Sequence, residues 1–119
     1  MPASFVECSF LIPVRRDANL SDGSPHLRAA WQWLDSELFD RFGGRTKAPG
    51  EYHGFYRDPD TEVQVADESI RFIVAIPKKD VGKLRSLLEG ACVIFAQKCV
   101  YLSVAGKVEF VEVKRGNKD

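Results

Sequence analysis

The chain has 119 residues, of which 45% are hydrophobic and 29% charged. These proportions are typical of one folded domain and exclude a disordered chain or a membrane protein. Its 17 basic and 17 acidic residues cancel, which argues against a nucleic-acid binder, because such proteins neutralise phosphates with excess Lys and Arg. No basic n-region or membrane-length apolar run is found, and the three cysteines form no C-x-x-C pair. We therefore expect a cytoplasmic protein with reduced thiols and no membrane partner.

The first predicted element is a strand over residues 6–14, because the even-numbered positions are apolar and the odd-numbered ones largely polar. A polar loop follows. Ser24 and Pro25 then predict the start of a helix, as N-cap and first helical residue. The helix is expected to run from about residue 25 to 42. Its buried face is formed by apolar residues three or four positions apart: Leu27, Trp31, Leu34, Leu38 and Phe42.

The segment 58–61, "DPDT", predicts a turn that joins two strands as a hairpin. Pairing outward from this turn places Tyr56 opposite Val63. The second strand then changes its apolar parity, from odd at Val63 to even at Ile70. A β-bulge is therefore expected within residues 66–69. With that bulge, the core side of the first strand carries Tyr52, Gly54 and Tyr56, and the open side carries Glu51, His53 and Phe55.

A second helix is predicted after Pro77, with Asp80 as its cap and a buried stripe that ends at Phe95. The last strand region, residues 99–113, favours a terminal hairpin over one long strand. A three-residue turn at 105–107 would pair Val104 with Val108 and keep the even-numbered apolar residues on one face. Residues 114–119 are expected to form a polar tail.

The order strand, helix, strand, strand, helix, strand indicates a ferredoxin-like βαββαβ sandwich of the α+β class. We expect a single domain over residues 1–113, in which an antiparallel sheet carries both helices on one face and an extra C-terminal hairpin strand.

Two segments resemble a known group of proteins. "FAQKCVYLSVAGKVEFV" (95–111) is similar to the F-G-Q-x-x-V-Y…G…F pattern of small uncharacterised bacterial ferredoxin-like proteins, and "GFYRDPDTEVQVADESIRFIVAIP" (54–77) shares their polar hairpin leading into Glu-Ser. Phe95, Gln97 and Glu68 carry the resemblance, and Ala96 stands where the group has Gly. The resemblance implies the fold and a bacterial origin but brings no chemistry.

The open sheet face is the predicted functional surface. Candidate ligand-binding residues are Glu51, His53, Arg71 and Tyr101, with Glu68 at the margin. A histidine exchanges protons near neutral pH, and a neighbouring carboxylate can orient it.

Two acids at the predicted bulge, Asp67 and Glu68, are read either as paired catalytic acids or as a solvated kink. The two histidines show no recurring ligand spacing, so no metal or other cofactor is expected.

The same face is expected to carry more apolar residues than a solvent-exposed surface usually does: Phe5, Leu11, Phe55, Ile73 and Tyr101. The favoured interpretation is therefore a non-catalytic module that self-associates as a homodimer and binds a small molecule or a protein. The third strand lacks the aromatic run of an RNA-recognition module. The alternative is a small acid–base enzyme with His53 as base and Glu51, Glu68 and Arg71 positioning charge.

Overall fold

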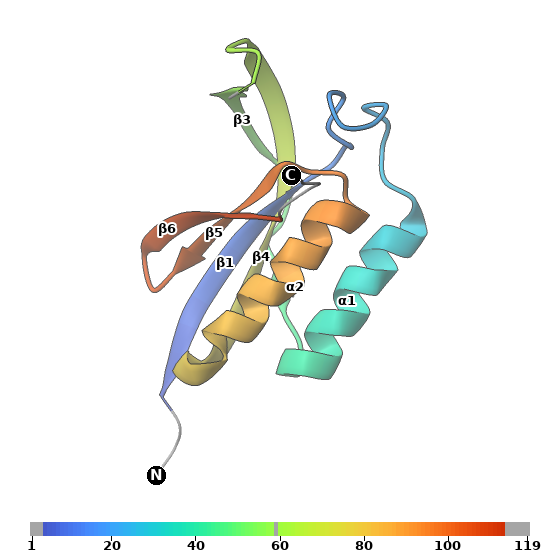
Figure 1. Ribbon diagram of the computed structural model, residues 1–119. Helices are drawn as coiled ribbons and strands as arrows, with labels where there is room; N and C mark the ends of the chain where they lie inside the picture. Colours follow the sequence, from blue (N-terminus) through green and yellow to red (C-terminus); the bar gives the residue numbers. More distant parts are fainter. Residues whose placement is uncertain (1–3, 59, 114–119) are drawn as a thin grey trace, which may run out of the picture.

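The computed structural model describes residues 4–58 and 60–113, which form a six-stranded sheet and two α-helices (Figure 1). In chain order the elements are β1 (Phe5–Pro13), α1 (Arg28–Phe42), β2 (Thr46–Lys47), β3 (Tyr52–Arg57), β4 (Gln64–Pro77), the 3-10 turn η1 (Lys78–Asp80), α2 (Val81–Ile94), β5 (Cys99–Val104) and β6 (Lys107–Glu112). The predicted tail, residues 114–119, lies outside the described residues.

The strands pair only as antiparallel neighbours in the described part of the chain. Their order is β2-β4-β1-β5-β6, and β3 also pairs with β4. Figure 1 shows α1 and α2 side by side in front of the sheet, whereas β3 and the adjoining end of β4 extend beyond both helices. The α+β class and the two helices over an antiparallel sheet are thus confirmed. No helix in these residues combines the length and apolar character needed to cross a membrane.

The core lies between the sheet and the helices. The even-numbered side chains of β1 and of the second half of β4 are buried, as the period-two pattern predicted. They meet the apolar faces of the two helices, and each fully buried apolar side chain contributes about 1.5–3 kcal/mol. The largest buried members are Phe10, Phe95, Ile12, Leu34, Leu38, Ile76, Leu84, Leu88 and Leu102.

The first helix begins three residues later than predicted, at Arg28. Its N-cap is Leu27 and not Ser24, so Leu27 lies before the helix and is 66% exposed, not on the buried face as predicted. The Ser24 carbonyl instead accepts a hydrogen bond from the Arg16 backbone N–H at 2.8 Å. Pro25 forms an isolated bridge with Arg15. This pairing keeps the chain extended up to the helix. Asp80 does occupy the predicted N-cap position of α2, although its side chain makes no capping hydrogen bond.

The predicted β-bulge at residues 66–69 is wrong, because β4 runs without interruption over Gln64–Pro77. It pairs residue by residue with β3 and with β1, so Tyr56 lies opposite Val65 and not opposite Val63. The apolar parity changes for another reason. The far end of β4 extends beyond the helices (Figure 1). Its even-numbered side chains therefore meet solvent, whereas those in the rest of the strand meet the core.

The register also reverses the predicted sides of β3. His53 lies opposite Glu68, which shares its side of β4 with the buried Phe72. The odd-numbered side chains of β3, including that of His53, therefore project to the helix side of the sheet, past the ends of the helices. Tyr52 and Tyr56 project to the helix-free side. The prediction reversed these sides because it inserted a residue that the strand does not have.

The C-terminal hairpin forms, with a turn shorter than predicted. Residues 105–106 alone connect β5 and β6, so Val104 pairs with Lys107 instead of Val108. Both turn residues have positive φ angles, 50° and 85°, as two-residue hairpin turns require. The shift turns Val108 and Phe110 to the helix-free face, where they are 53% and 61% exposed.

Candidate functional site

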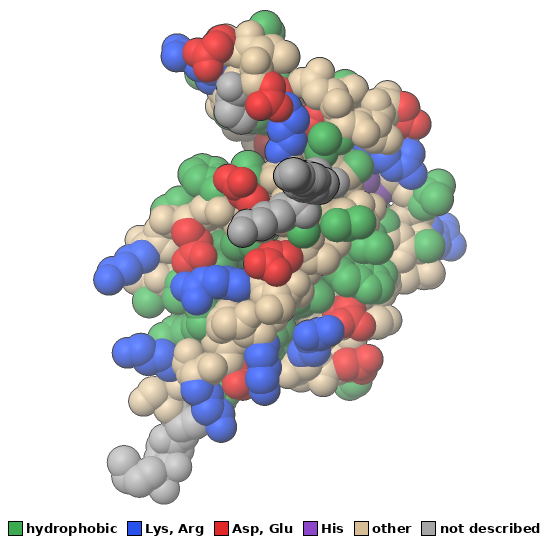
Figure 2. All heavy atoms as spheres, viewed as in Figure 1, with side chains coloured by type: hydrophobic (Ala, Val, Ile, Leu, Met, Phe, Trp, Pro, Cys, Tyr) green, Lys and Arg blue, Asp and Glu red, His purple; other side chains and the backbone are tan. Residues whose placement is uncertain are grey.

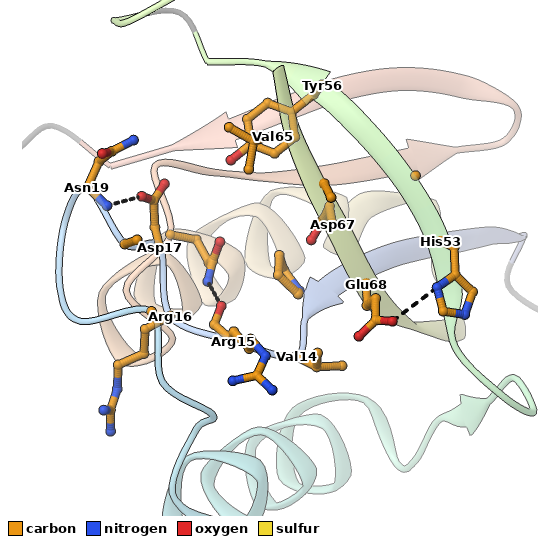
Figure 3. Close-up of a pocket in the computed structure, with 16 residues that line it drawn as sticks. Val14, Arg15, Arg16, Asp17, Asn19, His53, Tyr56, Val65, Asp67 and Glu68 are labelled. Atoms are coloured by element: carbon orange, nitrogen blue, oxygen red, sulfur yellow. Dashed lines mark hydrogen bonds and ion pairs between the residues drawn. The ribbon is translucent and has the colours of Figure 1, made fainter. Parts of the chain in front are cut away.

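A cavity of about 520 Å³ lies where the loop after β1 approaches the β3–β4 hairpin (Figure 3). One wall is formed by residues 13–19. The opposite wall comes from residues 53, 54 and 56 of β3 and 65–68 of β4, and Gly23 and Gln97 complete the lining. Figure 2 shows acidic and basic side chains close together on this upper part of the molecule.

Backbone hydrogen bonds hold the loop wall in place. The Val14 N–H donates to the Glu68 carbonyl at 2.8 Å, which continues the β1–β4 pairing past Pro13. The Asp17 N–H donates to the Ala96 carbonyl at 2.9 Å. The two walls of the cavity are therefore joined at its base, and the turn after α2 supports the loop from behind.

His53 and Glu68 face each other across the two hairpin strands. They are register partners, and His53 Nδ1 lies 3.2 Å from Glu68 Oε2. Their side chains are 68% and 49% exposed, and both residues line the cavity. An imidazole held by a carboxylate is a common arrangement for a general base.

Asp67 and Tyr56 add two groups that favour the protonated form. Burial raises the pKa of the Asp67 carboxyl, and the charge of Glu68 raises it further, although a hydrogen bond from Ser69 at 3.2 Å opposes both effects. Burial also raises the pKa of the Tyr56 phenol, and the nearby carboxylates of Asp17 and Asp67 act in the same direction. The Tyr56 phenol can donate a hydrogen bond to a molecule in the cavity, and the Asp67 carboxyl holds its proton to a higher pH than an ordinary aspartate.

A second cavity of about 300 Å³ adjoins the first, and Val14 lines both. Its walls include Trp31 and the guanidinium of Arg45, which lies 5.7 Å from the centre of the Phe72 ring. His26 also lines it and donates from Nε2 to the Pro13 carbonyl at 2.7 Å. Burial lowers the pKa of His26, so its imidazole stays neutral and helps to shape the junction of the two cavities.

Glu51, His53 and Glu68 could together hold a metal ion. One ligand atom from each lies within 4.8 Å of the others, and no other group of this kind occurs in the described residues. Two carboxylates and one imidazole suit a divalent cation such as Mn²⁺ or Zn²⁺. All three side chains are exposed. The sequence predicted one candidate site for these three residues but no metal there; the pairing of β3 with β4 brings their ligand atoms together.

The structure brings together three of the five predicted site residues. Glu51, His53 and Glu68 cluster beside the cavity. Arg71 and Tyr101 lie on the helix-free face and line neither cavity. Arg71 donates to the Ser9 hydroxyl at 3.4 Å, and the Tyr101 ring packs against Phe110. The predicted grouping of His53 with Arg71 is wrong, because it depended on the bulge.

The loop wall is the part of the site that sequence reasoning missed. Residues 13–19 were read only as the end of a strand and a polar loop. Asp17 and Asn19, two of the turn-forming residues in that loop, gave a sign that it is ordered, because such side chains often bond the local backbone. The Asp17 carboxylate indeed accepts the Asn19 N–H at 2.7 Å.

Comparison with known proteins finds no matching family model and no matching curated protein. The fold does match solved structures. A phage SAM lyase in complex with S-methyl-5'-thioadenosine is 13% identical, with 95% of this chain and 93% of that chain covered and a TM-score of 0.72. A phage SAM lyase in the apo state is 15% identical, with 97% and 94% covered and a TM-score of 0.62. At these identities the likeness shows a shared fold.

The likeness contradicts the favoured prediction of a non-catalytic module. Both matches are structures of a lyase, and both cover nearly the whole of this chain. The alternative prediction, a small acid–base enzyme, agrees better with these findings and with the cavity beside His53 and Glu68.

Proposed function

We propose that this chain is an enzyme that cleaves the sulfonium nucleoside SAM (S-adenosylmethionine) and releases S-methyl-5'-thioadenosine. The observation that carries the proposal is the His53–Glu68 pair on the wall of a 520 Å³ cavity, in a chain that shares its fold with a phage SAM lyase. Small-molecule sites typically have volumes of roughly 300–1,000 Å³, so the cavity is large enough for a nucleoside.

The product defines which bond breaks. S-methyl-5'-thioadenosine keeps the adenosine, the methyl group and the sulfur of SAM. The bond that is lost therefore joins the sulfur to Cγ of the aminobutyrate chain. Its electron pair goes to sulfur, which loses its positive charge. A lyase completes the released chain without water, either by loss of a proton from Cβ to form a double bond or by ring closure through the chain's own carboxylate.

Charged groups of both signs line the cavity, three carboxyls and the guanidinium groups of Arg15 and Arg16. The carboxyls suit the sulfonium cation of SAM, and the guanidinium groups suit the carboxylate of its aminobutyrate chain. Asp17 and Glu68 supply negative charge, while Asp67, whose pKa burial raises, holds its proton to a higher pH than an ordinary aspartate. In the elimination route His53 takes the Cβ proton and Glu68 orients its ring. Ring closure needs no base, so the two routes assign different importance to His53.

The test is to incubate the protein with SAM and to follow S-methyl-5'-thioadenosine by liquid chromatography and mass spectrometry. By the elimination route, Glu68→Gln is expected to lower the rate by about 100-fold or more, the scale of lost acid–base assistance. By ring closure, which needs no base, the loss should be smaller. Glu37→Gln is the matched control, because Glu37 is also in an ion pair but lies on α1, away from the cavity. NMR of the four-carbon product separates a double bond from a lactone. A wild-type protein that forms no S-methyl-5'-thioadenosine contradicts the proposal.

We also infer that copies of the chain associate through the helix-free sheet face, as the sequence predicted. Exposed Phe5, Val108 and Phe110 support this inference. Light scattering after size exclusion tests it. Phe110→Lys should give monomers, whereas Phe39→Lys, at an equally exposed site on α1, should leave the assembly intact. A wild-type monomer would overturn the inference.

The finer topology and the location also stay proposals. We infer that the chain has the ferredoxin-like βαββαβ core, with its second strand broken into β2 and β3, because both pieces pair with β4. We infer a cytoplasmic enzyme because no disulfide joins any two of the three cysteines, which all lie in the described residues.

A further inference from the structure

The tip of the β3–β4 hairpin contains a buried carboxylate that the proposed chemistry does not use. Asp58 follows β3, and its side chain is 0% exposed. A charge in such a position is retained only when it is paired and hydrogen-bonded. The sequence explained Asp58 as a turn residue, and its two turn contacts are present: Asp58 Oδ1 accepts the backbone N–H groups of Asp60 at 2.8 Å and Thr61 at 3.2 Å.

Asp58 also binds two side chains from distant parts of the chain. Asn19 Nδ2 donates to Asp58 Oδ2 at 2.8 Å, across 39 positions of sequence. Lys98 Nζ lies 3.2 Å from each carboxylate oxygen. The hydrogen bonds from Asp60 and from Lys98 hold the pKa of Asp58 below its usual value, so the carboxylate stays charged and the bonds persist at neutral pH.

These contacts join the two walls of the cavity at its outer end. Asn19 belongs to the loop wall and lines the cavity, whereas Asp58 belongs to the hairpin that forms the other wall. Lys98, in the turn after α2, contacts Asp58 on the hairpin side of this junction. Its neighbour Gln97 donates to the Arg15 carbonyl at 2.8 Å, so the same turn also holds the base of the loop. Asp58 and Lys98 do not line the cavity themselves.

We propose that Asn19, Asp58 and Lys98 form a latch that fixes the separation of the cavity walls and thereby sets the affinity for the nucleoside. This inference rests on the proposed function, because it takes the cavity as the substrate site. The three are positioning residues, since Asp58 and Lys98 act on the substrate only through the loop and the hairpin. With the latch broken, the walls must be ordered at each binding event, which weakens binding more than it slows the chemical step.

The test compares Lys98→Met with Lys98→Arg and Asp60→Asn. Lys98→Met keeps the length of the side chain but removes its charge, and Lys98→Arg restores the charge. Asp60→Asn is the matched control, because it removes the other, largely exposed partner of Lys98, 2.6 Å away, and leaves the Asp58 contact in place. Each variant is measured for KM and kcat with SAM, for affinity to S-methyl-5'-thioadenosine by calorimetry, and for amide hydrogen exchange in residues 14–19.

Lys98→Met is expected to raise KM and the dissociation constant by about 10- to 100-fold, to change kcat much less, and to speed exchange in residues 14–19. Lys98→Arg and Asp60→Asn should stay within about two-fold of the wild type. Unchanged affinity and unchanged exchange in Lys98→Met would overturn the latch. So would a fall in kcat at constant KM.

Two further results keep the latch and the proposed function apart. If the wild-type protein neither cleaves SAM nor binds S-methyl-5'-thioadenosine, the proposed function fails, and hydrogen exchange still decides whether the latch holds the loop. If Lys98→Met does not fold, Asn19→Ala replaces it, because that variant detaches the loop but leaves the Asp58–Lys98 pair intact. Unaltered loop exchange and affinity in Asn19→Ala would then overturn the latch.

Discussion

Replacement of Phe95 by alanine tests whether the segment after α2 is a structural support for the site. The Phe95 ring is fully buried, and its centre lies 4.8 Å from that of His26 and 4.9 Å from that of Trp31. Removal of a buried Phe ring typically costs about 3–5 kcal/mol, from the lost burial and the cavity left behind. Domains of this size have a total stability of about 5–15 kcal/mol, so the loss should be a large part of the whole.

Urea unfolding followed by circular dichroism measures this cost. Phe39→Ala serves as the control, because Phe39 is 68% exposed on α1 and should change stability by no more than about 0.5 kcal/mol. If Phe95→Ala costs less than about 1 kcal/mol, the ring is not packed as described, and the support of the loop wall by this segment must be abandoned.

Two further predictions concern single residues. Ala105→Asn should stabilise the protein by about 0.5–1 kcal/mol, as measured by thermal unfolding. Ala105 has a φ of 50°, and Asn-Gly is the preferred sequence for a two-residue hairpin turn. A destabilised variant would refute the two-residue turn. Asp67→Asn should raise stability at neutral pH. The raised pKa of Asp67 means that the folded state holds its proton more tightly, so stability is lost as pH rises from below about 4 through the folded pKa. The gain from Asp67→Asn should therefore vanish at pH 3, and a gain that persists there would contradict this explanation.

Much of the fold could be predicted because its core obeys simple periodicities. The alternation in β1 and the apolar stripes of α1 and α2 each bury one face, as expected, except that Leu27 lies before α1 and is exposed. The errors arose where no core dictates the pattern. Beyond the helices both sides of the hairpin meet solvent. The change of the apolar positions from odd at Val65 to even at Ile70 therefore marks the end of the helix layer and not the predicted bulge.

The site was predicted in part for the same reason. Glu51, His53 and Glu68 were chosen by residue type, and the pairing of β3 with β4 brings them together. Arg71 was added because the bulge placed it on the same face. The loop wall and the burial of Asp58 depend on contacts across 39 or more positions, which local patterns do not encode.

The most direct test of the account is the reaction itself. Purified protein is mixed with SAM in excess, and S-methyl-5'-thioadenosine is quantified over time beside the Glu68→Gln variant. The account predicts many product molecules per wild-type chain and, where the four-carbon product carries a double bond, a loss of about 100-fold or more in the variant. No product from the wild-type protein, or equal rates from the two when the elimination product forms, would contradict the claim that the cavity beside His53 and Glu68 is an active site.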